Sequence, residues 1–254
     1  MKEDSIFPIN IQIEDVREAI RDGNDIREFI FDDFVIFSYT IIKDDTFPNP
    51  EEANDERTKL LRQLRRECRG IVFSKDGKLL ARRFHKFFNI NENKESKVEN
   101  IKFDENCEYE ILQKLDGSMI SPFILDEKII WASKKGFSPV EKMVSSYVEE
   151  LEKKQENKIK YKDFVTHMSS QGFTVIFEWC SPRSPIILKY QQDSLCLVAI
   201  RENKTGNYIN FEETKIVAKK FEIPLVEPLK LEIHPKSITE LIEIIKLQKG
   251  IEGK

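Results

Sequence analysis

A nucleophile, an acid and a small-residue turn stand together near the middle of the chain, in the run Lys114, Leu115, Asp116, Gly117 and Ser118. These residue types suit covalent nucleotidyl transfer, with Lys114 as the nucleophile. A lysine has an ordinary pKa of about 10.4, so at pH 7 only about one in a few thousand is neutral and able to attack phosphorus. Such a site must therefore lower the pKa with nearby cations and partial burial, and the same cations offset charge in the transition state.

The same run also fits an ordinary surface turn. Lys-x-Asp-Gly arises by chance in roughly a few per cent of chains this long, and Asp-Gly commonly links two strands. The flanking residues favour chemistry, because 110–112 and 119–125 predict strands that lead into and out of the turn. Functional residues often lie on loops that a rigid scaffold positions. We therefore predict a catalytic turn between two strands.

The composition is that of a globular protein. The chain has 254 residues, of which 40% are hydrophobic, and its 18 phenylalanines are ample for a packed core. A net charge of -4 argues against a protein that coats long nucleic acid, although a local basic pocket stays possible. The scattered cysteines and histidines predict no zinc site. Without a signal-peptide core or an apolar run of about 20 residues, we expect a soluble intracellular protein, cytoplasmic or nuclear, with no membrane partner.

Cationic residues gather on both sides of a predicted β-hairpin at 70–84. Arg62 and Arg65 precede it on a predicted helix, and we interpret them as a solvated face. Arg69 and Lys86 flank the hairpin more closely, and we do not extend the solvated-face interpretation to them. The alternative for Lys86 is a core strand from which its side chain points outward.

Hydrophobic spacing predicts an α+β fold of many antiparallel strands with a few helices. The predicted strands are 34–42, 70–73, 79–84, 128–132, 173–179 and 195–200. A capping box at Ser138 and Glu141 predicts the start of one amphipathic helix, and a second helix is expected to end near Gly172. Ser237 opens a last amphipathic helix. Its inward-facing residues are predicted to be Leu241, Ile242 and Ile245.

Taken together, these segments resemble the ATP-dependent RNA ligase 1 family of T-even bacteriophages, the tRNA-repair RNA ligases of the covalent nucleotidyltransferase superfamily. The matching segments are 67–73, 86–92, 114–118, 172–178, 201–208 and 251–253. Segment 114–118 matches the family's motif I, 172–178 is similar to motif III and 251–253 to the opening of motif IV. The resemblance implies a nucleotidyltransferase domain, an ATP-grasp-like ligase domain of antiparallel sheets with flanking helices, over residues 34–254. Residues 1–33 are then an unassigned N-terminal extension, in which 11–20 fits a helix.

The resemblance also implies an activity, namely an ATP-dependent RNA ligase that joins 5′-phosphate and 3′-hydroxyl RNA ends, as in tRNA or RNA repair. Lys114 would attack the α-phosphorus of ATP and form a lysyl-adenylate, while Tyr39, Arg69 and Lys86 would hold the triphosphate. The other nucleotide-binding residues that it implies are Asp116, Gly117, Glu178, Glu252 and one of the pair Lys134 and Lys135. Glu178 would bind a ribose hydroxyl, and Glu252 would lie near Mg²⁺, which prefers oxygen ligands and phosphates.

Three of these assignments have structural alternatives. Tyr39 also fits a plain strand aromatic, and Glu178 also fits an edge carboxylate in solvent. An extra residue leaves open whether Lys134 or Lys135 is the family's functional lysine. The family continues past motif IV into paired lysines and a C-terminal helical domain, whereas this sequence stops at Lys254. We therefore expect a truncated fragment rather than a degenerate member, one that binds ATP and reacts poorly by itself.

Three further functions fit parts of the pattern. An mRNA-capping-type guanylyltransferase uses the same lysine chemistry with GTP, but segment 86–92 favours the ligase branch. A DNA ligase fits less well, because no oligonucleotide-binding domain follows. A non-catalytic RNA-end-binding module would keep the nucleotide pocket without turnover. Nucleotide preference separates the guanylyltransferase from the RNA ligase. The effect of Lys114→Ala on covalent adduct formation separates either enzyme from the RNA-end-binding module.

Overall fold

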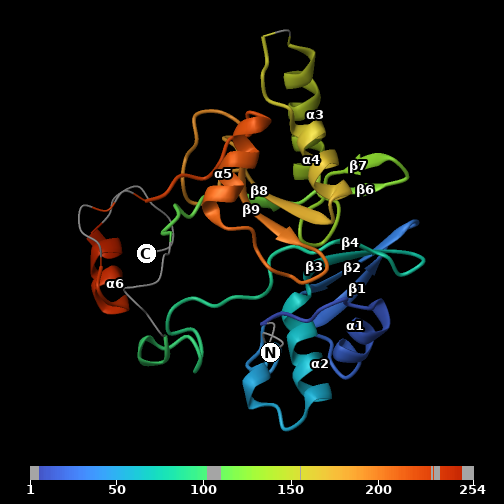
Figure 1. Cartoon of the computed structure of the whole chain (residues 1–254), viewed down its shortest axis with the longest axis vertical. Coiled ribbons are helices and arrows are strands. Elements are labelled where there is room, and N and C mark those ends of the chain that lie inside the picture. The colour runs from blue at the N-terminus through green and yellow to red at the C-terminus, as the bar shows by residue number, and fades with distance from the viewer. Residues whose placement is uncertain (1–5, 102–109, 155, 230, 232–234, 248–254) are drawn as a thin grey trace.

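The computed structural model describes residues 6–101, 110–154, 156–229, 231 and 235–247. It shows an α+β arrangement with two main antiparallel sheets, each flanked by helices (Figure 1). The helices are α1 (Ile13–Ile20), α2 (Glu56–Glu67), α3 (Pro139–Lys153), α4 (Tyr161–Ser170), α5 (Phe211–Lys220) and α6 (Ile238–Leu247), with short 3-10 turns η1 (Pro50–Glu52) and η2 (Val98–Asn100). The predicted α+β class is confirmed.

The first sheet has the strand order β1-β2-β3-β4. Its strands are β1 (Ile26–Ile30), β2 (Phe34–Tyr39), β3 (Arg69–Ser74) and β4 (Leu79–Ala81). Helices α1 and α2 cover one face, and a core cluster that includes Val16, Leu64 and Phe37 fills the space between them and the sheet. β1 pairs with β2 along its whole length, so α1 and β1 are part of this sheet even though the sequence left residues 1–33 unassigned.

The second sheet has the order β5-β8-β9. Its strands are β5 (Ser118–Ile120), β8 (Phe173–Cys180) and β9 (Ser194–Glu202), and a separate hairpin is formed by β6 (Phe123–Leu125) and β7 (Lys128–Ile130). The aromatic side chains of Phe164, Phe177 and Trp179 are fully buried between this sheet and its helices. The apolar face predicted for α3 lies in this core, and its capping box is present.

A buried ion cluster joins the two sheets. Glu67, at the end of α2, accepts hydrogen bonds from Arg82, which follows β4, and from Arg201 in β9, with shortest distances of 2.7 Å to each. All three side chains are at most 1% exposed. Burial alone would raise the pKa of the Glu67 carboxyl, but the charges and hydrogen bonds of the two guanidinium groups outweigh it and lower the pKa. The buried Glu67 carboxylate, which is paired with both guanidinium groups, therefore holds the second sheet to α2.

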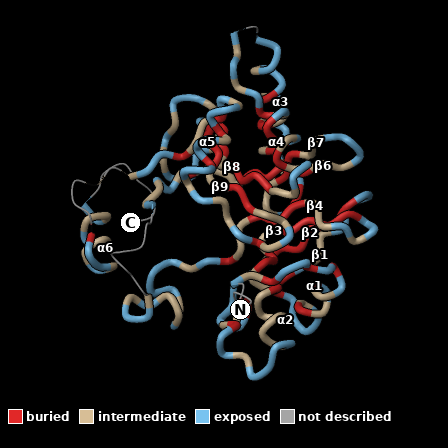
Figure 2. Tube along the Cα trace, in the orientation of Figure 1, coloured by how far each residue is buried: buried red, intermediate tan, exposed pale blue. Residues whose placement is uncertain are grey.

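Several local predictions need correction. Residues 119–125 form two strands, β5 and β6, and 110–112 form only an isolated bridge from Leu112 to Pro228. Arg65 is not on a solvated face, because its guanidinium is held by Asp25 and by main-chain carbonyl oxygens. None of the residues described in α6 is buried, so its predicted inward positions are only half-buried. Figure 2 shows the buried residues concentrated along the two sheets and the helix faces against them.

Candidate nucleotidyl-transfer site

The turn that carries Lys114 packs directly against β8. Lys114 itself is exposed, in the segment before β5. A Cβ atom on Gly117 would lie 2.2 Å from the carbonyl oxygen of Trp179, far inside contact distance. Only glycine lets the turn approach β8 this closely, which is the physical reason for a glycine after Asp116.

Asp116 ties this turn to the segment that follows β8. Its side chain is buried, and one carboxylate oxygen accepts the main-chain N–H groups of Ile187 and Leu188 at 2.5 Å each. The main-chain N–H of Asp116 donates to the hydroxyl oxygen of Tyr190 at 2.9 Å. An exposed Asp-Gly turn would make none of these contacts, so the surface-turn alternative is wrong. No spacing in the sequence pointed to Tyr190 or to the main chain at 187–188.

Glu178 lies beside the same turn. Its Oε1 accepts the main-chain N–H of Gly117 at 3.1 Å. Burial raises the pKa of the Glu178 carboxyl to about 7, because it outweighs the hydrogen bond from Gly117 and the charges of Lys114 and Arg69. Glu178 is not an edge carboxylate in solvent.

Tyr39 and Lys134 form one part of a cationic wall. The Nζ of Lys134 lies 3.7 Å from the centroid of the Tyr39 ring. Burial alone would raise the pKa of the Tyr39 hydroxyl, but a hydrogen bond and charge from Lys134, with the charges of Arg69 and Lys86, lower it overall. Lys135 is exposed. The structure thus distinguishes the two lysines that the sequence left open, and places Lys134 against Tyr39.

Gly70 lets β3 approach the turn that carries Lys134. Its φ is +98°, and a Cβ atom there would lie 2.8 Å from the carbonyl oxygen of Lys134. Residues other than glycine are disfavoured both by this φ and by the contact. Gly70 thus lets the main chain of Lys134 lie against β3, beside Arg69, which precedes Gly70 in that strand.

Aromatic rings and one carboxylate hold the other two cations of the wall. The guanidinium of Arg69 lies 4.4 Å from the centroid of the Phe87 ring. Lys86 is only 7% exposed, and its Nζ lies 3.0 Å from Glu92 Oε1 and 4.3 Å from the centroid of the Phe88 ring. The alternative in which Lys86 points outward is therefore wrong.

Arg69 links the cationic wall to the nucleophile turn. Its charge lowers both the pKa of Tyr39 and that of Glu178, so it lies close to the two groups. The charges of Arg69, Lys86 and Lys134 thus act on Tyr39, and the charges of Lys114 and Arg69 act on Glu178. Charge-assisted hydrogen bonds from such cations suit a triphosphate.

The predicted metal ligand Glu252 lies outside the described residues. Within the residues that the structure describes, no group of three or more His, Cys, Asp or Glu side chains is arranged to hold a metal ion. The described part of the chain also contains no helix long and apolar enough to cross a membrane.

Solved structures define the class of fold. A putative ATP-dependent DNA ligase from Aquifex aeolicus superposes with a TM-score of 0.50 and 16% sequence identity, covering 92% of this chain and 55% of that one. An archaeal ATP-dependent RNA ligase superposes with a TM-score of 0.52 and 10% identity, covering 92% and 54%. This chain therefore shares the fold of these ATP-dependent ligases.

Sequence comparison defines the family. A model described as RNA ligase, of the T4 RNA ligase 1 type, matches residues 67–254. A putative RNA ligase from Thermovibrio ammonificans is 31% identical over 196 residues, which are 76% of this chain and 45% of that protein. RNA ligase 1 of bacteriophage TS2126 is 28% identical over 151 residues, which are 57% and 36%. The chain belongs to this RNA ligase family, and it spans less than half the length of these curated relatives.

Proposed function

We propose that this protein is an ATP-dependent RNA ligase that joins 5′-phosphate and 3′-hydroxyl RNA ends through a lysyl-adenylate on Lys114. The observation that carries the proposal is the 3.1 Å hydrogen bond from the main-chain N–H of Gly117 to Glu178 Oε1, which joins the turn after Lys114 to a carboxyl on which the charge of Arg69 also acts. Family membership supports the reaction class. Joining two RNA ends needs a leaving group on one of them, and an adenylate supplies it.

In the first step the Nζ of Lys114 attacks the α-phosphorus of ATP. The phosphorus–nitrogen bond forms as the bond to pyrophosphate breaks, and the amine loses a proton. Arg69, Lys86 and Lys134 hold the triphosphate, so that pyrophosphate leaves on the side opposite the lysine. Tyr39 steadies Lys134 through its ring and hydroxyl. Preorganised cations reduce the barrier because they are already oriented toward the charge of the transition state.

The other predicted residues position the nucleotide. Glu178 accepts a ribose hydroxyl, and Asp116 and Gly117 keep the turn docked on β8. Mg²⁺ is the proposed cation, because it is bound through few carboxylates together with phosphates and water, and Glu252 is its proposed protein ligand. When bound, it would neutralise phosphate charge.

The domain bounds, the RNA partners and the location of the protein are part of the same proposal. The adenylyltransferase domain, predicted to span residues 34–254, includes α1 and β1 as well, because β1 completes the first sheet. The proposed partners are RNA ends, in tRNA or another structured RNA, as in RNA repair. A cytoplasmic location stays a prediction.

The test is intact-protein mass spectrometry after incubation with Mg²⁺ and either ATP or GTP. We expect one AMP on the wild type and none on Lys114→Ala. Lys128→Ala, a change in an exposed lysine at the start of β7, is the control and should be adenylylated normally. A GMP adduct would favour a capping-type guanylyltransferase. AMP on Lys114→Ala, or no adduct on the wild type, would contradict the proposal, and the second result would favour an RNA-end-binding module.

A further inference from the structure

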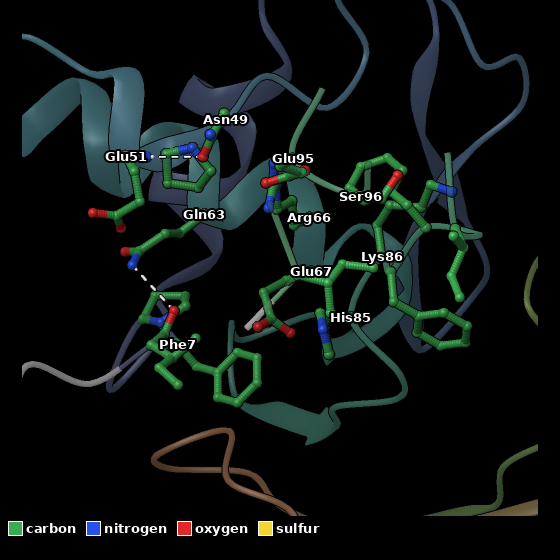
Figure 3. Close-up of a pocket in the computed structure, with 17 residues that line it drawn as sticks. Phe7, Asn49, Glu51, Gln63, Arg66, Glu67, His85, Lys86, Glu95 and Ser96 are labelled. Atoms are coloured by element: carbon green, nitrogen blue, oxygen red, sulfur yellow. Dashed lines mark hydrogen bonds and ion pairs between the residues drawn. The ribbon is translucent and has the colours of Figure 1, made fainter. Parts of the chain in front are cut away.

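A cavity of about 390 Å³ adjoins the cationic wall. It lies between residues 6–8, helix α2 and the segment 85–101, and Lys86 is part of its lining. In Figure 3, Asn49 and Gln63 lie on one side of it and Lys86 and Ser96 on the other. None of the roles assigned above uses this space.

Phe87 gives the cavity an accessible aromatic surface. Its side chain is 50% exposed although Arg69 is stacked on it. Among the phenylalanines that the structure describes, only Phe137 is comparably exposed. Both rings have edge-to-face neighbours, Phe31 and Phe34 for Phe137 and Phe84 and His85 for Phe87, but only Phe87 lines the cavity. An exposed ring on a cavity wall is suited to stack on another flat group, and nucleobases stack on aromatic side chains whatever their sequence.

The charges that line the cavity are compensated. Lys86 is paired with Glu92, and Arg66 with Glu95 at 2.7 Å. His85 is uncharged at neutral pH, because burial, with the charge of Arg201, lowers its pKa to about 4. Glu67 is neutralised within the buried ion cluster described above. A cavity without surplus positive charge fits an uncharged base and sugar better than a phosphate group.

The reaction geometry indicates which nucleoside would reach this place, and this step rests on the proposed function. After adenylylation, a 5′-phosphate oxygen of the donor RNA attacks the same phosphorus. The new phosphorus–oxygen bond forms as the phosphorus–nitrogen bond breaks, and the Lys114 amine leaves and regains a proton. In-line displacement requires attack opposite the leaving group. The donor phosphate must therefore enter where pyrophosphate left, on the side of Arg69 and Lys86.

We propose that this cavity binds the 5′-terminal nucleoside of the donor RNA strand, with its base stacked on Phe87. Lys86 lies where the cationic wall meets the cavity, because it belongs to that wall and also lines the cavity. If the 5′-phosphate of a nucleotide is bound by Lys86, the sugar and base attached to that phosphate lie next to Lys86. The cavity that Lys86 lines is next to it as well.

The experiment separates the two chemical steps. Wild-type and variant chains are first adenylylated with ATP, then freed of ATP and given either a nucleoside 3′,5′-bisphosphate or the abasic ribose 3,5-bisphosphate. Phe87→Leu should raise the KM for the nucleoside bisphosphate about 5- to 100-fold, the range expected for loss of one stacked base. Its preference for the nucleoside donor over the abasic donor should fall by the same factor. Because Phe87 also holds Arg69, adenylylation by ATP is measured separately for each variant, and any change in it is the same for both donors and cancels in this preference.

Two further variants control for packing. Phe87→Tyr keeps a stacking ring and should behave as the wild type. Phe137→Leu removes the other exposed phenylalanine, at a distance from the cavity lining, and should leave both steps unchanged. An unchanged KM and an unchanged preference for the nucleoside donor in Phe87→Leu would overturn the proposal.

Failure of the proposed function would be recognised separately, as absence of the AMP adduct on the wild type. The cavity would then be tested by fluorescence anisotropy, with a labelled 5′-phosphorylated trinucleotide as the probe and unmodified protein. Weaker binding in Phe87→Leu but not in Phe137→Leu would support a nucleoside site without catalysis. Equal affinity for all variants, or no binding to the wild type, would overturn it.

Discussion

The main-chain N–H of Gly117 donates a 3.1 Å hydrogen bond to Glu178 Oε1, so the turn after the nucleophile and the end of β8 are joined at a titrating carboxyl group. Motif I supplies one partner and motif III the other. The position of Lys114 therefore depends on a contact between segments 61 residues apart. Four predictions follow from this site and from the cluster that supports it.

Gly117→Ala should slow adenylylation at Lys114 by about 100-fold. The new methyl group would lie 2.2 Å from the Trp179 carbonyl oxygen, so the turn must move away from β8 and the bond to Glu178 must break. A displacement of about 1 Å at a reacting group can cost roughly 100-fold in rate. Single-turnover formation of the AMP adduct measures this. Gly172→Ala is the control, because its Cβ would meet nothing within 4 Å, although its φ of +83° still costs about 1–2 kcal/mol.

Glu178 should make the protein less stable as the pH rises. The pKa of its carboxyl is about 7 in the folded protein against an ordinary value of about 4.5, so the folded state binds more protons between these two values. The stability that protonated Glu178 confers is fully present below about pH 4.5 and is lost as the pH rises through 7, by at most about 3 kcal/mol.

Thermal unfolding of wild type and Glu178→Gln from pH 4.5 to 8 checks this prediction. The variant should lose less stability across the range and have the higher melting temperature at pH 8. Glu149→Gln, a change at an exposed position on α3, should follow the wild type. Parallel pH profiles for wild type and Glu178→Gln would show that the carboxyl is not destabilised by burial.

Lys134→Ala should weaken ATP binding more than Lys135→Ala. Lys134 lies against Tyr39 in the cationic wall, whereas Lys135 is exposed. Removing one charge-assisted contact to phosphate should raise the KM for ATP in adenylylation by about 10-fold or more. Lys135→Ala should stay within about twofold of the wild type. Equal effects, or a larger effect at Lys135, would contradict the assignment of Lys134.

Glu67→Gln should destabilise the whole molecule. It would leave the buried guanidinium groups of Arg82 and Arg201 without a compensating charge, a change that typically costs about 3–5 kcal/mol. Urea unfolding measures the free energy difference. Glu18→Gln removes one partner of the exposed ion pair with Arg57 and should leave the unfolding midpoint unchanged. A similar small effect for both variants would show that the cluster is not a stabilising junction.

Much of the architecture could be predicted from sequence because the signals are local. The strands around Phe37 and Phe177 follow from runs of β-branched and aromatic residues, and α3 follows from its capping box and apolar spacing. The nucleophile turn was found for the same reason, because Lys114 to Ser118 are consecutive. For α6 the amphipathic pattern correctly predicted a helix, but the residues predicted to face inward are only half-buried, because the pattern does not show what the helix packs against.

The sequence by itself determined which residues are chemically able to act, and only the tertiary structure decided which of them meet. Spacing could not choose between Lys134 and Lys135, because the contact with Tyr39 depends on how β3 approaches a turn more than 60 residues away. Arg65 was predicted to lie on a solvated face, because its partner Asp25 is 40 residues away in the sequence and only the fold brings the two side chains to 2.6 Å. Contacts between residues distant in the chain form only when the sheets pack, and no local pattern encodes them.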